Sequence, residues 1–145
     1  MSLAALDHGA PAGRRERVTA PALVAGAVLG ASVVLHLRDP ARSGSYLFCP
    51  WLVLTGTNCP GCGGLRAVNE LTHGDLAAAA SSNLLFVGSI PLIGYLWVRW
   101  FVDRWRGIVR VVPHRRGVAA ALAFAGVALA FAILRNLPGL EWLAP

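Results

Sequence analysis

The sequence contains no lysine, and charged residues occupy only 14% of its 145 positions. Apolar residues occupy 56% of the chain, and the mean hydropathy is +0.59. Soluble globular domains carry roughly 25% charged residues and a smaller apolar share. The scarcity of charge therefore excludes an ordinary soluble domain and indicates a single-domain integral membrane protein.

Motifs for hydrolysis and for nucleotide chemistry are also missing. The chain has no paired carboxylates, no serine nucleophile motif and no phosphate-binding glycine loop. The net charge of +6 comes from arginines that stand beside long apolar runs and form no face with stacking aromatics. We therefore expect neither a nucleotide nor a nucleic acid as a partner, because membrane topology accounts for the same charge.

Cysteine is scarce as well, and the chain is organised around the stretch that holds it. Cys49, Cys59 and Cys62 are the only cysteines, and residues 49–64 contain all three together with two prolines and four glycines. An odd count excludes a fully paired intrachain disulfide framework. The Cys-x-x-Cys spacing suits either a metal site or a redox pair.

Three apolar segments predict transmembrane helices, at about residues 20–37, 83–101 and 117–134. The first contains 18 residues without a formal charge, which as a helix extend about 27 Å and nearly span a bilayer core. Such a run near an N-terminus can also be a cleavable signal peptide, with small residues at positions 30–32 as the cut. Its length favours a retained anchor.

The rest of the chain is predicted to form a tail and a cap. Residues 1–19 are polar and small, which predicts a disordered cytoplasmic tail ahead of a single membrane domain at 20–145. A cysteine-rich cap at 38–82 separates the first two spans, and its cysteine loop should pack on the membrane surface. An amphipathic helix follows at about 65–72, and Asp75 can cap the next helix. The fold class is therefore an all-α membrane protein.

The arginines predict the orientation of the spans. Nine stand on one side, in the tail and in the loop between the second and third spans, and four stand on the other side. Cytoplasmic loops carry the excess of positive charge. We therefore expect a multi-pass protein of the cell membrane whose N-terminus and second loop are cytoplasmic and whose cysteine loop and C-terminus face outward.

A longer pattern connects the cysteines with residues downstream. It comprises Cys49-Pro50, Thr55-Gly56, Cys59-Pro60-Gly61-Cys62-Gly63, Arg66, His73-Gly74-Asp75 and Asn83. Over roughly residues 40–95 the chain resembles the DUF2752 family of small, uncharacterised bacterial membrane proteins. The resemblance marks as site residues the three cysteines, Gly61, Gly63 and Arg66. This chain departs from the family at Leu65, where threonine is frequent, and at Leu84, where proline is frequent. The resemblance implies no activity.

One hypothesis for the three thiols is a metal site. Zinc held by thiolates takes four ligands, with sulfur at about 2.3 Å. His73 would complete a Cys3His set, but on one continuous helix it would lie roughly 16 Å along the axis from Cys62. His36 is the alternative, because the topology puts it at the outer end of the first span. Water, Asp75 or a partner's side chain are further possibilities, and an iron–sulfur cluster, which also needs a fourth ligand, is less favoured than zinc.

Two other hypotheses use the same residues. In the first, Cys59 and Cys62 act as a redox pair with Cys49 as a shuttle, favoured by the start of a helix and by Arg66, which both stabilise thiolate. The lack of alternating strands and helices of the thioredoxin type weighs against this membrane oxidoreductase. In the second, a structural disulfide joins Cys49 to Cys59 or Cys62 and pins the cap. Arg66 can instead form an ion pair with Glu70, one helical turn away.

We favour the metal hypothesis and a non-enzymatic role. The chain is then a small accessory or assembly subunit whose outward cap binds one ion, with zinc preferred. Alanine and glycine on its helices permit close helix contact. The expected partners are the lipid bilayer and either a larger membrane protein or a second copy of the chain.

Overall fold

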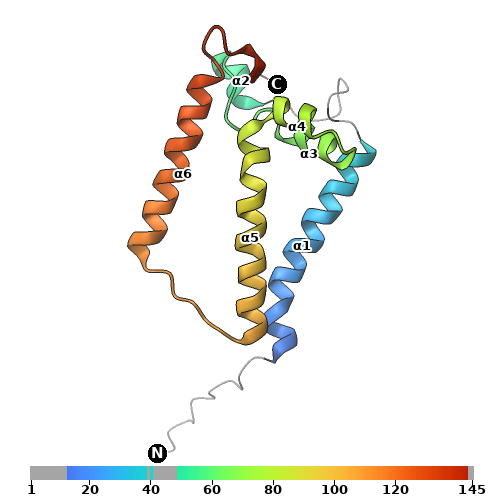
Figure 1. Cartoon of the computed structure of the whole chain (residues 1–145), viewed down its shortest axis with the longest axis vertical. Coiled ribbons are helices and arrows are strands. Elements are labelled where there is room, and N and C mark those ends of the chain that lie inside the picture. Colours follow the sequence, from blue (N-terminus) through green and yellow to red (C-terminus); the bar gives the residue numbers. More distant parts are fainter. Residues whose placement is uncertain (1–12, 39, 41–48, 144–145) are drawn as a thin grey trace, which may run out of the picture.

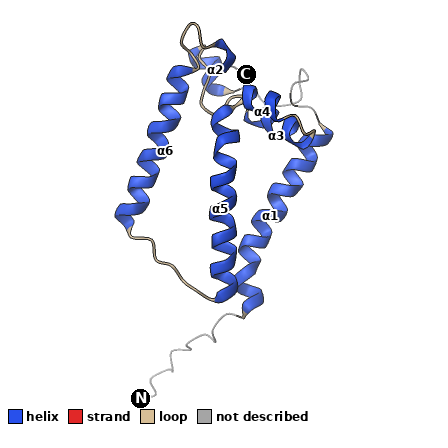
Figure 2. Ribbon diagram, in the orientation of Figure 1, coloured by secondary structure: helices blue, strands red, loops and turns tan. Residues whose placement is uncertain are grey.

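The protein is described by a computed structural model that covers residues 13–38, 40 and 49–143. Across these residues the fold is all helical and contains no strand (Figure 2). The elements are α1 (Arg14–Leu37), α2 (Pro50–Thr55), α3 (Gly64–Thr72), α4 (Leu76–Ser82), α5 (Leu84–Arg106), α6 (His114–Leu134) and the 3-10 helix η1 (Glu141–Leu143).

Three helices, α1, α5 and α6, are long and apolar enough to cross a membrane. This confirms the predicted fold class, with the three cysteines between the first and second spans. Large apolar side chains along these helices are exposed, among them Leu23 at 73% and Phe124 at 63%. Such faces suit contact with lipid, since a soluble domain rarely exposes so much contiguous apolar surface.

The short helices gather at one end of the three spans, and the loop between α5 and α6 lies at the opposite end (Figure 1). Helix α1 packs against α5, and the indole N–H of Trp97 donates a hydrogen bond to the carbonyl of Pro21 at 3.2 Å. Helix α6 stands apart from both in Figure 1. Contacts at the cap must therefore hold α6 in place.

The spans begin and end close to the predicted positions, with two differences. Helix α1 begins at Arg14, where the carboxylate of Glu16 accepts a hydrogen bond from the backbone N–H of Gly13 at 3.1 Å. Residues 14–19, expected in a disordered tail, are helical, and Gly13 directly precedes the helix. Residues 1–12 of the predicted tail lie outside the described residues. Helix α5 continues past the expected end at 101 to Arg106.

The cap is more helical than its proline and glycine content predicts. Residues expected to form a loop instead form α2, since Pro50 at the first helical position lacks only an N–H that would have no helical partner. The amphipathic helix expected at 65–72 is confirmed as α3. Asp75 caps α4 as predicted, because its carboxylate accepts a hydrogen bond from the backbone N–H of Ala78 at 2.8 Å.

The packed core of the described residues is small and lies mainly in and next to the cap. Helix α3 packs against α4 and α1, and α4 packs against the start of α5. The buried apolar residues are Pro21, Leu35, Ala67, Ala79, Phe131 and Leu143, and the buried polar ones are Ser82, Asn83, Asp103 and Arg135. The cap is therefore the rigid part of the molecule on which a site can be built.

Candidate metal centre

The three cysteine sulfurs come together in the cap. All lie within 4.8 Å of one another, and none of the three cysteines forms a disulfide. The sulfur of Cys49 is 3.5 Å from those of Cys59 and Cys62, which are 2.6 Å apart. Two sulfurs on one tetrahedral zinc ion lie about 3.8 Å apart when each bond is about 2.3 Å. The two distances from Cys49 are close to this value, whereas the Cys59–Cys62 distance is more than about 1 Å shorter, so a bound ion would move these two sulfurs apart. With that adjustment the half-buried group could hold a metal ion.

Local sequence explains how the sulfurs are positioned. Cys49 precedes the first turn of α2, and Cys59 and Cys62 bracket a turn closed by a hydrogen bond from the Cys62 N–H to the Cys59 carbonyl at 3.1 Å. The backbone N–H of Cys59 also donates to the Cys62 sulfur at 3.2 Å. This donor by itself favours thiolate, the form that binds metals, but burial and the hydrogen bonds to the other thiols outweigh it and raise the pKa of Cys62.

The two glycines predicted to support the site, Gly61 and Gly63, differ in whether their backbone conformation requires glycine. Gly63 has a φ of +80°, in the left-handed region that side chains disfavour, and it lies between the cysteine turn and the first residue of α3. Gly61 has no positive φ, and a Cβ there would meet the Cys59 sulfur at 4.0 Å, an ordinary contact. Only Gly63 is therefore required by its backbone conformation.

The two histidines predicted as ligands, His36 and His73, contact each other and do not belong to the sulfur group. The rings of His36 and His73 stack with their centroids 4.3 Å apart and join α1 to α3. His36 forms a hydrogen bond with the Thr72 hydroxyl at 3.1 Å, and His73 bonds the Asn69 carbonyl at 2.8 Å. Within the described residues, the group that can hold an ion consists of the three cysteines alone.

Arg66 lies on the first turn of α3, half-buried. In the described structure it forms no ion pair with Glu70, whose carboxylate oxygen Oε2 is buried without a hydrogen-bond partner. The ion pair found among the described residues is that of Asp103 with Arg110. The influence of Arg66 on the thiols stays a prediction.

Asn83 is a supporting residue whose role the sequence did not reveal. It is 1% exposed, and its side-chain N–H groups donate to the carbonyls of Pro60 and Cys62, both at 3.0 Å. Its side-chain oxygen accepts from the Phe86 N–H at 2.9 Å and so caps α5. One buried amide thus fixes the cysteine turn to the start of the second span.

Arg135 is the second such residue, and it links the third span to the same turn. It follows α6, is 2% exposed, and donates from Nη1 to the carbonyls of Cys59 at 2.9 Å and Cys62 at 3.1 Å. The neighbouring Asn136 side chain exchanges two hydrogen bonds of 2.8 Å with the backbone of Asn58. The only feature of the sequence that could have indicated this contact is a single arginine at the end of the third span.

The charges of the cap depend on one another. Hydrogen bonding, first from the Leu52 backbone and then from the other two thiols, lowers the pKa of Cys49. Burial, together with hydrogen bonds to the other thiols, raises the pKa of Cys62 to about 12. Burial also lowers the pKa of Arg135, while negative charge on Cys62 and Cys59 opposes that change. A cation at the centre would favour thiolate at all three cysteines.

Comparison with known proteins supports the predicted resemblance. The family model DUF2752 matches residues 49–97. Its description is that of a protein of unknown function. The DUF2752 match begins at Cys49, includes the other two cysteines and ends within α5. No curated protein and no solved structure gave a significant match. The comparisons therefore support the resemblance over residues 49–97 and assign it no activity.

Proposed function

We propose that this chain is a small membrane accessory or assembly subunit whose cap is held by one metal ion on Cys49, Cys59 and Cys62. Zinc is the favoured ion, because thiolate ligands select it and it needs no redox partner. The observation that carries the proposal is the convergence of three free sulfurs, from two separate turns, to within 4.8 Å.

The charge around the sulfurs also supports this proposal. A divalent ion with three thiolates carries one net negative charge, and burying such a charge without a partner is costly. The buried guanidinium of Arg135 supplies the opposite charge beside the turn. A neutral fourth ligand such as water then leaves the whole group uncharged. A side chain from a partner is the alternative fourth ligand.

An ion at this position would act as a structural clamp. It would join the start of α2 to the cysteine turn, and that turn already holds α5 through Asn83 and α6 through Arg135. A structural metal contributes directly to folding, because the unfolded chain lacks the preformed site. We further propose that the clamped cap faces outward and presents the spans to a larger membrane protein or to a second copy.

The close contact between Cys59 and Cys62 favours a second candidate function. Their sulfurs lie 2.6 Å apart, nearer to each other than to Cys49. In a thiol oxidoreductase, Cys59 and Cys62 would form their disulfide by exchange with the disulfide of a partner protein, which is reduced to a dithiol. The Cys49 thiolate would then attack the Cys59–Cys62 disulfide, form a mixed disulfide with one of these cysteines and release the other as thiolate. A permanent structural disulfide from Cys49 to Cys59 or Cys62 is the further alternative, and the sulfur of Cys49 lies 3.5 Å from each of the other two.

Elemental analysis of the full chain, purified in detergent under reducing conditions without chelator, tests the metal proposal. We expect about one zinc per chain, and less than about a tenth of that in Cys49→Ser, which removes one of three ligands. His36→Ala is the matched control and should keep its metal. Metal-free wild-type protein would sink the proposal. Thiol trapping in cells would then separate a disulfide that cycles from one that is permanent.

A further inference from the structure

A second polar site lies at the end of α5 opposite the cysteines. It is a cavity of about 390 Å³, a size within the usual range for small-molecule sites. Three arginines contribute to its lining, Arg99 and Arg106 from the last turns of α5 and Arg110 from the loop that follows. Neither the cysteine site nor the DUF2752 match, which ends at residue 97, explains these three side chains.

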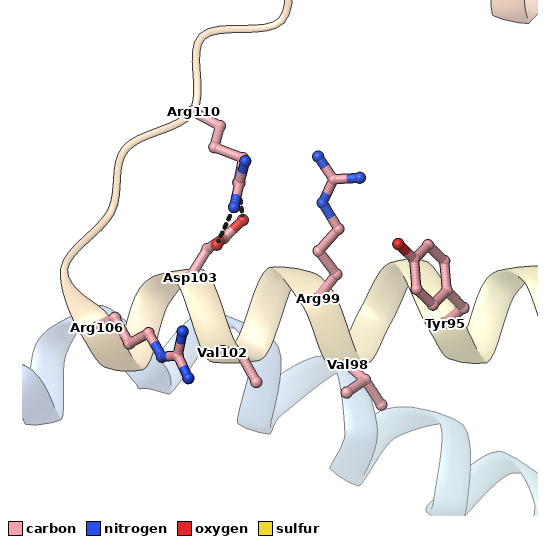
Figure 3. A pocket seen from close by; sticks show the side chains of 7 residues that line it. All are labelled: Tyr95, Val98, Arg99, Val102, Asp103, Arg106 and Arg110. Carbon is pink, nitrogen blue, oxygen red and sulfur yellow. Dashed lines mark hydrogen bonds and ion pairs between the residues drawn. The ribbon is translucent and has the colours of Figure 1, made fainter.

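Two of the three arginines, Arg99 and Arg110, lie on the same side of α5, whereas Arg106 points away from them (Figure 3). Figure 3 shows Tyr95, Arg99 and Asp103 projecting from α5 in the same direction, with Arg110 reaching down from the loop toward them. Arg110 donates two hydrogen bonds to the two carboxylate oxygens of Asp103, from Nε and from Nη2. This bidentate pair fixes Arg110 over the cavity and neutralises the one acidic group that would repel an anion.

Positive charge remains after that pairing. No hydrogen bond or ion pair engages the guanidinium groups of Arg99 and Arg106 within the described part of the chain. The guanidinium of Arg99 and the phenol hydroxyl of Tyr95 are therefore available on the side of α5 that Arg110 faces, and Arg106 adds a second positive charge to the lining. A guanidinium fork matches the geometry of phosphate oxygens and binds them by charge-assisted hydrogen bonds.

Tryptophans and apolar residues near the cavity indicate that it lies at the level of the lipid headgroups. Trp97, Trp100 and Trp105 lie on the same stretch of α5, and tryptophans concentrate at the level of the lipid headgroups. Val98 and Val102 line the cavity beside the arginines, and Leu92, one turn before Tyr95, is 60% exposed. An apolar chain can therefore continue from the charged end along α5.

We propose that this cavity binds a phosphate group, with Arg99 as its principal ligand and the phenol hydroxyl of Tyr95 as a second donor, beside the Asp103–Arg110 pair. Two sources of the group share this chemistry, the headgroup of an anionic phospholipid and a soluble phosphate. The tryptophans and the apolar lining suit the lipid headgroup. The site is independent of the cysteines, so it stands whether or not the cap holds a metal.

The test measures lipid retained by the full-length protein. The chain is reconstituted in phosphatidylcholine nanodiscs containing phosphatidylglycerol, and lipid that stays bound after extraction is counted by native mass spectrometry. Arg99→Gln should weaken binding about fivefold, the effect of one arginine on an anionic lipid. Arg104→Gln is the matched control, because it removes the same charge from the same helix outside the cavity.

Three results decide the proposal. Loss of phosphatidylglycerol in Arg99→Gln with retention in Arg104→Gln supports a lipid site. Displacement of the lipid by millimolar inorganic phosphate, with the same difference between the two variants, supports a soluble phosphate ligand. Equal loss in both variants, or no retained lipid and no phosphate binding in the wild type, overturns the proposal, because the arginines would then act only as diffuse positive charge.

Discussion

The two ends of the three spans both carry arginine, but they bury it very differently. At the cysteine end, Arg135 is 2% exposed and bonds two backbone carbonyls. At the other end, the side chain of Arg110 is 53% exposed even though it is paired with Asp103. A buried polar group is costly when it loses its partners, whereas an exposed one is solvated by water. The cysteine end is therefore built for rigidity, and the arginine end is open to ligands.

Among the variants considered, removal of one cysteine sulfur should most strongly reduce the rigidity of the cysteine end. In Cys59→Ser the cap would lose one of its three proposed metal ligands, so we expect the metal content to fall to background and the melting temperature to drop by roughly 10 °C or more. Tryptophan fluorescence of the detergent-purified chain measures the melting temperature. Ser81→Ala, an exposed cap residue on α4, should change neither quantity. Unchanged metal and melting in Cys59→Ser would contradict a structural ion.

The two ends of α6 offer the sharpest comparison. Arg135→Gln leaves the buried carbonyls of the cysteine turn without a cation, and we expect zinc affinity to fall about 10- to 100-fold, as for other residues that support metal ligands. Arg115→Gln removes the same charge from the exposed first turn of α6 and should leave the affinity unchanged. Zinc titration against a competing chelator measures both. Equal affinities in the two variants would refute the role of Arg135.

A smaller effect is expected at Asn83, which carries no charge. Asn83→Ala removes three hydrogen bonds from a site that is 1% exposed, at an expected cost of about 1 to 3 kcal/mol. Hydrogen exchange should rise at the first turn of α5 and at the cysteine turn together. Asn136→Ala is the comparison, because that side chain is exposed and water can replace its bonds. Faster exchange at α5 alone would show that Asn83 only caps the helix.

The sequence predicted those parts of the molecule that depend on local pattern. Long apolar runs identify the spans. The cysteine turn follows from the Cys59–Cys62 spacing, and the cap of α4 follows from Asp75; each of these involves residues within one turn of the chain. The bonds of Arg135 to the cysteine turn join residues more than 70 positions apart, and no local pattern reports them. Helix α2 was missed because Pro50, which usually marks a turn, also suits the first position of a helix.

The smallest effect on stability and metal content is expected for the histidines. The distance along α3 argued against His73 as a ligand from the sequence alone, and in the structure it stacks on His36 at an exposed position. We expect His73→Ala to lower the free energy of unfolding by less than about 1 kcal/mol, because water can solvate the exposed His36 ring once the stacked His73 ring is removed. Metal content should stay at the wild-type level, and elemental analysis beside the melting curve measures both. Loss of the metal in this variant would mean that the cap rearranges around the ion to bring His73 to the sulfurs, and the rigidity inferred for the cysteine end would then be wrong.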